Sequence, residues 1–186
     1  PATVLTADVL TADAAGAITL DTTVNSADIS TSAAGAIDID ETNAITLTAV
    51  DTNSGTITVD AGGTITVGVV NATAGASNVT LTTTAGSIID DVSDAVTDVR
   101  GAVVTLTATA GVGETAGNGS LDTAAASFDV SVTGAGLINL NEVDAVTLTD
   151  VDTANGSITI VSGGAMTATD VASTTDNDAN DITLTT

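Results

Sequence analysis

The stretch GAIDIDETNAITLTAVDTNSGTITVDAGGTITV (residues 35–67) decides the fold, because it reappears 101 residues later as GLINLNEVDAVTLTDVDTANGSITIVSGGAMTA (residues 136–168). Over the longer window 35–73 the two copies align without a gap, and 18 of the 39 positions are identical. A long repeat built from smaller units indicates a stacked, elongated architecture rather than a globule around a single site.

Short runs of alternating residues recur along the whole chain. Ile, Val or Leu stands at every second position with Thr, Asp or Ser between, which is typical of a strand with one buried face. Turns rich in Gly and Asx separate the runs. The runs are AITL (17–20), AIDID (36–40), AITLTAV (44–50), TITV (56–59 and 64–67), NVTLT (78–82), VVTLT (103–107), FDVSV (128–132), VTLT (146–149), SITI (157–160) and DITLT (181–185).

The spacing of these runs predicts the fold class. Ile37 recurs as Ile57 and Ile45 recurs as Ile65, in both cases at an interval of about 20 residues. Such an interval holds two or three short strands, which is one turn of a coil. We therefore predict an all-β protein, a right-handed parallel β-helix (β-solenoid) with about 20 residues per turn and roughly nine turns.

The domain organisation follows from the same period. Residues 1–186 are predicted to form a single β-solenoid segment, with copies of the 101-residue repeat near 16–100 and 119–186. One repeat would then span about five turns. Two segments break the pattern, 86–102 and 111–120, and we expect both to be loops on the rod. For 86–102 a short helix is the alternative, because its apolar residues recur every three or four positions.

Composition excludes several classes of function. The chain carries 24 Asp and Glu but one basic residue, for a formal charge of −23, which disfavours nucleic acid and anionic membrane surfaces as partners. No apolar run is long enough for a membrane span. There is no Cys, His, Trp or Tyr. The start at Pro1, partway through a repeat and without a visible signal peptide, suggests a segment of a longer chain.

Two immunoglobulin-like domains of about 100 residues are the alternative fold. Such sandwiches usually contain a core Trp or Tyr and show no short period of this kind. This chain shows the period and has Phe128 as its one aromatic residue, which we expect to be buried.

The sequence LDTAAASFDVSVTGAGLINLNEVDAVTLTDVDTANGSITIVSGGAMTATD (121–170) resembles the haemagglutinin-like β-helix repeats of giant bacterial surface and secreted adhesins, which are similar to filamentous haemagglutinin. The elements GSIIDD (86–91), VTLTATAGVGE (104–114) and NEVDAVTLTDVDT (141–153) carry the same resemblance. It implies a parallel β-helix that is secreted or displayed on the surface of a bacterium. It also implies a structural or adhesive scaffold, a rigid stalk or a filament-forming segment. The expected partners are neighbouring repeats, or copies of the chain stacked end to end through unpaired strand edges.

Carboxylates are the main candidates for a binding site; we expect that no cofactor is required, and calcium is the one that these carboxylates suggest. Oxygen ligands at alternate positions beside a turn suit this hard cation. None of the clusters fits a known calcium loop, and a solvated acidic surface is the simpler interpretation. The candidate calcium ligands are Asp38, Asp40 and Glu41; Asp90, Asp91 and Asp94; and Asp176, Asp178 and Asp181.

Two further classes of function are open to the same sequence. Threonine pairs such as 56–58 and 64–66 could bind ice if they shared one flat face, but threonine is also simply favoured on the outer side of strands. Catalysis would require acid–base partners, yet the serines have no His or Lys to activate them, and sugar-cleaving sites need aromatic platforms. We expect no enzyme activity and no catalytic residue.

Overall fold

A computed structural model of the chain describes residues 4–73, 77–114 and 119–186, and it contains only strands, turns and irregular segments over these ranges. All of the strands belong to one continuous parallel sheet. The strands are β1 (Leu5–Thr6), β2 (Val9–Ala14), β3 (Ile18–Thr23), β4 (Ser26–Ala34), β5 (Ile37–Glu41), β6 (Ile45–Ser54), β7 (Ile57–Ala61), β8 (Ile65–Val67), β9 (Val70–Ala72), β10 (Val79–Thr83), β11 (Ser87–Asp90), β12 (Val99–Ala108), β13 (Gly111–Val112), β14 (Leu121–Val132), β15 (Ile138–Glu142), β16 (Val146–Thr153), β17 (Ile158–Ser162), β18 (Met166–Ala168), β19 (Val171–Ser173) and β20 (Ile182–Thr185).

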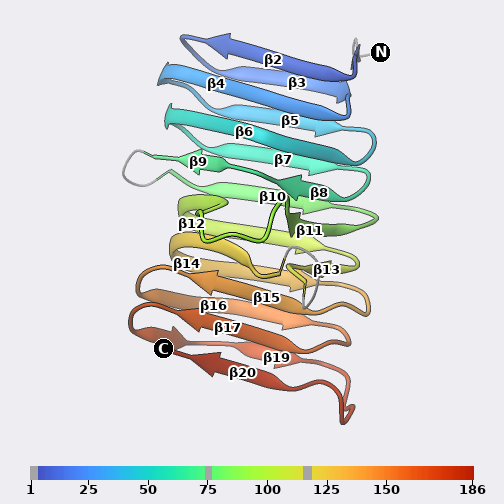
Figure 1. Cartoon of the computed structure of the whole chain (residues 1–186), viewed down its shortest axis with the longest axis vertical. Helices are drawn as coiled ribbons and strands as arrows, with labels where there is room; N and C mark the ends of the chain where they lie inside the picture. Colours follow the sequence, from blue (N-terminus) through green and yellow to red (C-terminus); the bar gives the residue numbers. More distant parts are fainter. Residues whose placement is uncertain (1–3, 74–76, 115–118) are drawn as a thin grey trace.

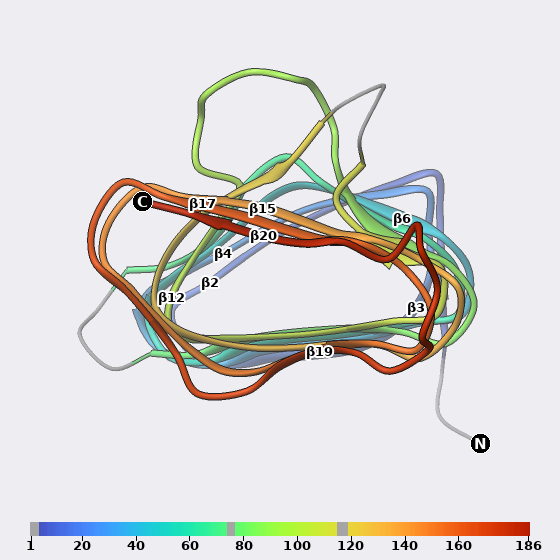
Figure 2. The same cartoon turned by 90° about the horizontal axis from the view of Figure 1, so that it is seen from below.

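The chain winds as a right-handed β-solenoid of about nine turns, as its sequence period predicts (Figure 1). Seen along its axis, the coil is a flattened oval with two long faces (Figure 2). One face holds β3, β5, β7 and β10, and the other holds β2, β4, β6 and β8. Each strand therefore pairs with the strand one full turn away. At about 4.8 Å per turn, nine turns make a rod roughly 43 Å long.

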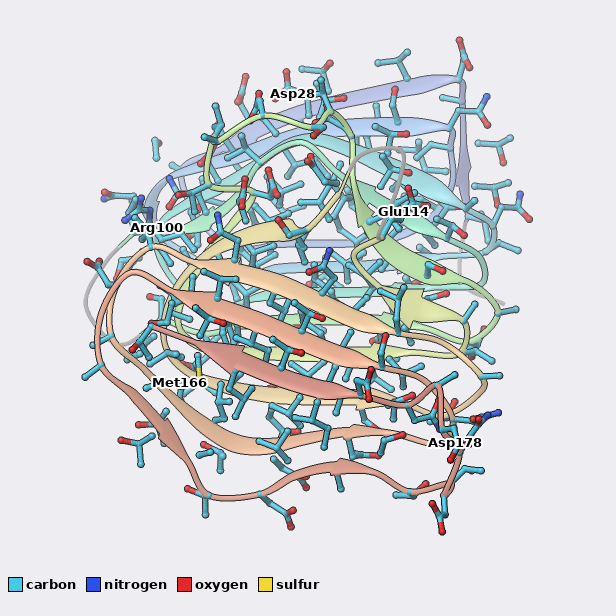
Figure 3. The ribbon with its side chains drawn as sticks, turned by 60° about the horizontal axis from the view of Figure 1, so that its bottom comes forward. Asp28, Arg100, Glu114, Met166 and Asp178 are labelled. Carbon is cyan, nitrogen blue, oxygen red and sulfur yellow. The ribbon has the colours of Figure 1, made fainter. Side chains whose placement is uncertain are left out.

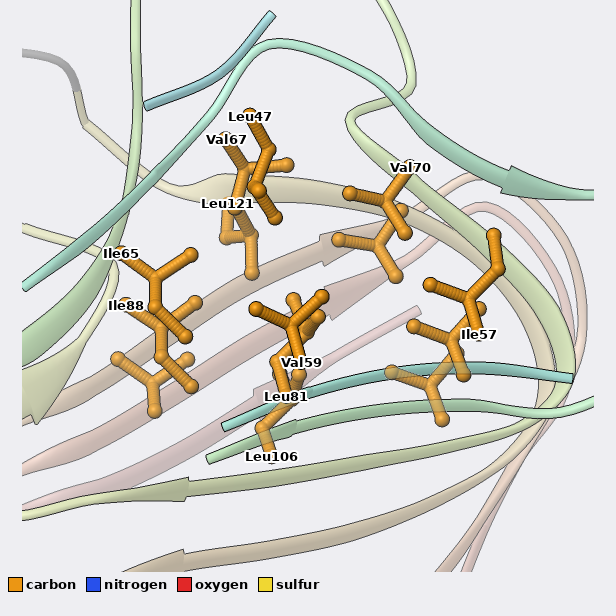
Figure 4. Close-up of a cluster of buried hydrophobic side chains, with 14 of the residues drawn as sticks. Leu47, Ile57, Val59, Ile65, Val67, Val70, Leu81, Ile88, Leu106 and Leu121 are labelled. Carbon is orange, nitrogen blue, oxygen red and sulfur yellow. The ribbon is translucent and has the colours of Figure 1, made fainter. Parts of the chain in front are cut away.

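Aliphatic side chains fill the interior in axial columns, because inward and outward residues alternate along strands such as β5, β7 and β10. Figure 4 shows Val59, Leu81 and Leu106 lying over one another on successive turns. The full column runs Leu20, Ile39, Val59, Leu81, Leu106, Val130, Val151 and Val171. Phe128 stacks between Val104 and Leu148 and is fully buried, which confirms the expectation for this residue.

Turn length is not uniform, and this changes how the two repeats are placed. The turn that carries Leu20 to Ile39 is short, whereas the turn that carries Leu81 to Leu106 is several residues longer. Ile37 lies in the column of Ile57, but its repeat equivalent Ile138 lies in the column of Ile45 on the opposite face. One 101-residue repeat thus spans about four and a half turns instead of the expected five.

The long central turns explain the two predicted loops. Residues 91–98 leave the coil between β11 and β12 and form the green loop that projects from one long face in Figure 2. The loop is thus narrower than predicted, since residues 87–90 and 99–102 lie within strands, and it forms without a helix. In the second predicted loop, residues 111–112 form β13, and residues 115–118 lie outside the described part of the chain.

Glycines permit the tightest corners, where backbone stacks directly on backbone. A Cβ atom at Gly55 would overlap the carbonyl group of Gly35 one turn away, and one at Gly156 would overlap that of Gly136 in the same manner. Gly16, at the first such corner, has open space around it.

The corner geometry predicts the effect of adding a methyl group. Gly55→Ala should destabilise the fold by about 2 kcal/mol or more, because a rigid carbonyl must move. Gly16→Ala is the matched control and should change the free energy of unfolding by less than about 1 kcal/mol. Urea unfolding measures both values. Equal stabilities for the two variants would contradict the stacked corner.

Candidate functional site

Two buried glutamates occupy equivalent corners of the two repeats. The Glu41 carboxylate accepts hydrogen bonds from Thr22 Oγ1 (2.8 Å), Val24 N (3.0 Å) and Asn43 N (3.0 Å). Two of these donors come from the preceding turn, and the third lies just after the glutamate. Glu41 is 4% exposed.

Glu142 repeats this arrangement donor by donor. Its carboxylate accepts from Thr123 Oγ1 (3.0 Å), Ala125 N (2.9 Å) and Asp144 N (3.1 Å), at the same three sequence separations. Burial raises the pKa of Glu142, and these hydrogen bonds oppose the shift. Because the repeats are offset by half a turn, the same device closes corners at opposite ends of the oval. It satisfies backbone donors that the sheet ladder leaves unpaired.

A second device at the corners uses threonine. Thr52 Oγ1 donates to the carbonyl oxygen of Gly35 (2.8 Å), and Thr153 Oγ1 donates to that of Gly136 (2.6 Å). Both threonines are buried. Corners of this coil are therefore closed by polar side chains that turn inward, and their task is structural.

The first group of candidate calcium ligands is divided by this geometry. Asp38 and Asp40 are exposed and point outward, but Glu41 follows the alternation of the strand and points inward. Grouping Glu41 with the outward carboxylates is therefore wrong. On the outer face, Asp40 instead stacks between Asp21 and Asp60 on consecutive turns. Partial desolvation and the charges of Asp38, Asp21 and Asp60 raise the pKa of Asp40.

The second group lies at the projecting loop. Asp90 is buried at the end of β11 and accepts a hydrogen bond from Val92 N (3.1 Å), whereas Asp91 and Asp94 are exposed. Asp94 accepts from Val96 N (2.7 Å). In both bonds the donor lies just beyond the aspartate in sequence, as in Asx turns, so they shape the loop locally.

The third group, Asp176, Asp178 and Asp181, is exposed near the C-terminal end (Figure 3 labels Asp178). Within residues 4–73, 77–114 and 119–186, no set of three or more acidic side chains is arranged to hold a metal ion. Calcium binding stays a prediction.

Sequence reasoning missed Asp98, which is the most perturbed carboxyl of the described chain. Its side chain is buried at the foot of the projecting loop and accepts a hydrogen bond from Asp122 N (2.7 Å). Desolvation raises its pKa to about 8, with repulsion from Asp90, Asp122 and Asp94 adding to the shift. No motif marks this position, because the aspartate becomes buried only where the loop returns to the coil.

The threonine pairs occupy different faces, as expected for 56–58 and 64–66: Thr58 lies on β7 and Thr66 on β8. On one face, Thr80 and Thr82 stack on Thr105 and Thr107 of the next turn. Asp60 and Asp129 interrupt the array on either side. A threonine surface of two turns results.

Comparisons with protein-family models, with curated proteins and with solved structures found no match for this chain. A search of the described residues for a helix long and apolar enough to cross a bilayer found none.

Truncation of a corner glutamate should be costly. Glu142→Ala leaves the Ala125 and Asp144 N–H groups without an acceptor inside the coil, so we expect a loss of about 2–4 kcal/mol in the free energy of unfolding. Asp28→Ala, at an exposed position, is the control and should lie within about 0.5 kcal/mol of the parent chain. Chemical denaturation tests both, and a Glu142→Ala chain as stable as the control would refute the structural role.

Asp98 should make the fold less stable as the pH rises. Its pKa is raised in the folded chain, so its contribution is fully present below about pH 4 and is lost as the pH rises to about 8. Asp98→Asn keeps an oxygen acceptor for Asp122 N without a charge. Between about pH 4.5 and 9, the melting temperature of the variant should increase relative to that of the parent chain. The difference should reach about 4 °C or more at the alkaline end. If the melting temperatures of the two chains changed with pH in parallel over this range, the result would contradict a buried Asp98 carboxyl with a raised pKa.

Proposed function

We propose that this chain is a rigid structural scaffold, a stalk or filament-forming segment of a large bacterial surface or extracellular protein. One observation carries the proposal: aliphatic columns run without a break along the rod, beside backbone hydrogen bonds that join each turn to the next. Such a core holds its length and direction, which is what a spacer or fibre requires.

The composition supports an exposed setting for this role. A formal charge of −23 keeps rods apart and soluble, and the resemblance to haemagglutinin-like repeats favours a secreted or cell-surface location. We propose no enzymatic function. The interior holds the one aromatic side chain. Glu41 and Glu142 accept hydrogen bonds at the corners, Asp90, Asp98 and Asp122 are buried near the projecting loop, and Asp21, Asp40 and Asp60 form a ladder on the outer face.

The main alternative is a calcium-dependent or ice-binding surface module. The Asp21, Asp40 and Asp60 ladder and the two-turn threonine surface are the features that would serve it. Each occupies only a few turns, whereas the stacked core runs the length of the rod, and we therefore favour the scaffold.

A scaffold of independent turns should shorten in whole-turn steps. The chain has no cysteine, so spin labels can be placed at Asp28→Cys and Val161→Cys, which lie six turns apart on one face. Pulsed electron resonance should give a narrow distribution centred near roughly 29 Å. Deletion of residues 45–64, one whole turn, should leave a folded chain and shorten this distance by about 4.8 Å.

The matched control removes half a turn, residues 55–64. This deletion moves later strands to the opposite face. It should prevent cooperative folding, since the inward side chains of successive turns would no longer stack on equivalent side chains. A broad distance distribution in the parent chain, or equal tolerance of both deletions, would overturn the rigid scaffold.

A further inference from the structure

The pair Asn155–Gly156 lies at the corner between β16 and β17 (Figure 1). Both residues are partly exposed, and neither belongs to a strand. The coil continues on both sides of this corner. Gly136 of the preceding turn lies against Gly156, and Asn180 of the following turn is hydrogen-bonded to Asn155. The pair is therefore held between neighbouring turns within the body of the rod.

The backbone N–H of Gly156 has no acceptor among residues 4–73, 77–114 and 119–186. At the equivalent corner of the first repeat, the N–H of Gly55 donates to Ser77 Oγ (3.2 Å). Ser54 there ends strand β6, whereas Asn155 lies beyond the end of β16. The second corner thus differs from the first, because it leaves a backbone nitrogen unbonded beside an asparagine side chain.

The side-chain carbonyl of Asn155 is polarised by its neighbour. Its Oδ1 atom accepts a hydrogen bond from Asn180 Nδ2 (2.9 Å). If a nucleophile attacks Cγ of Asn155, negative charge develops on Oδ1, and an N–H donor at this distance stabilises that charge as in an oxyanion hole. The nearest nucleophile is the nitrogen of Gly156, which carries no Cβ beside it to hinder its approach. The attack is intramolecular and closes a five-membered ring, which favours it further.

We propose that Asn155 is a site of spontaneous covalent modification, at which a succinimide forms with Gly156 and opens to aspartate or isoaspartate. The nitrogen of Gly156 bonds to Cγ of Asn155, the Cγ–Nδ2 bond breaks, and ammonia leaves. The amide proton passes to a base in the solvent, and water supplies the proton that ammonia carries away. Water then adds to either carbonyl of the ring and breaks its bond to the Gly156 nitrogen. This inference goes beyond the proposed scaffold role and does not depend on it.

The two products have different consequences for the corner. Opening at the backbone carbonyl gives isoaspartate, in which the main chain passes through the former side chain and is longer by one carbon atom. Gly156 already lies against the carbonyl group of Gly136, so a longer chain must displace this corner. Opening at Cγ gives aspartate, which keeps the length of the main chain and an oxygen acceptor for Asn180. Isoaspartate is therefore the product that disturbs the stacking of β17 on β15.

Peptide mapping of the incubated chain tests the proposal. The sequence contains a second Asn-Gly pair, Asn118–Gly119, and Asn118 lies outside the described residues. Cleavage after each glutamate separates the sites, because it gives distinct peptides for residues 42–114, 115–142 and 143–186. After incubation at mildly alkaline pH, mass spectra report the exchange of ammonia for water and locate it. Enzymatic methylation of isoaspartate then identifies the linkage.

The first repeat offers a matched comparison. Ser54→Asn creates an Asn-Gly pair at the corner where the N–H of Gly55 is bonded to Ser77 Oγ. In the folded chain this new site should react about fivefold more slowly than Asn155, because that hydrogen bond must break before the nitrogen can attack. Adding Ser77→Ala to Ser54→Asn removes the acceptor and should abolish most of the difference.

The donor on Asn155 is tested in the same way. Asn180→Ala removes the hydrogen bond to Oδ1 and should slow the modification of Asn155 by about threefold or more. Asn155→Ser places the residue of the first repeat at this corner and should leave it unmodified. In denaturing urea the parent site and the Ser54→Asn site should react at similar rates, since the fold no longer distinguishes them.

Two results would overturn the proposal. One is a folded parent chain in which Asn155 stays intact during a period that modifies it in urea. The other is a Ser54→Asn site that reacts as fast as Asn155 in the folded chain, because the free N–H of Gly156 would then have no influence. The first result needs no variant, so it remains decisive if a substitution prevents folding.

Discussion

In-register stacking between successive turns is the constraint on which the whole structure depends. Each strand finds its hydrogen-bond partner one turn away, and each inward side chain finds a similar side chain in the same direction. If one face of a turn gains or loses a residue, the chain must compensate for the change in length before the next turn begins, so that the strands stay in register. The long central turns absorb theirs in the loop 91–98, outside the coil, so that Val79 still meets Val104. β-Branched and small aliphatic residues suit this narrow interior, and one Phe is enough to complete it.

The corners show how a coil of parallel strands treats its remaining polar groups. Where the backbone turns, its N–H groups leave the ladder, and a buried acceptor must replace the lost partner. Glu41 and Glu142 supply that acceptor to three donors each, and Thr52 and Thr153 satisfy carbonyl groups at neighbouring corners. These inward carboxylates explain why part of the acidity of the chain is unavailable to external ligands.

Local alternation and the regular spacing of the runs predicted the strands, the parallel coil and the inward columns, because these depend on residues near one another in the sequence. The sequence-based prediction grouped Glu41 with the outward carboxylates, although the alternation of the strand indicated that it points inward. It lies one step past the outward Asp40, and Glu142 occupies the same position in the other repeat. Asp98 had no such signal, since its burial depends on where a loop rejoins the coil. The length of the central turns was equally hidden, because the ungapped alignment of 35–73 with 136–174 does not reach residues 77–114 and so gave no spacing for them. The sequence also left open whether any of the carboxylates bind calcium.

The half-turn offset between the repeats has a consequence for the outside of the rod. Thr46 of the first copy and Thr147 of the second are equivalent in sequence, yet they face opposite directions, because one pairs in the column of Thr66 and the other in that of Ser127. The molecule thus has an approximate screw symmetry, in which a half rotation about the axis accompanies the advance from one repeat to the next. Thr46 and Thr147 are consequently displayed on opposite flanks of the rod, whereas the projecting loop 91–98 marks one long face only.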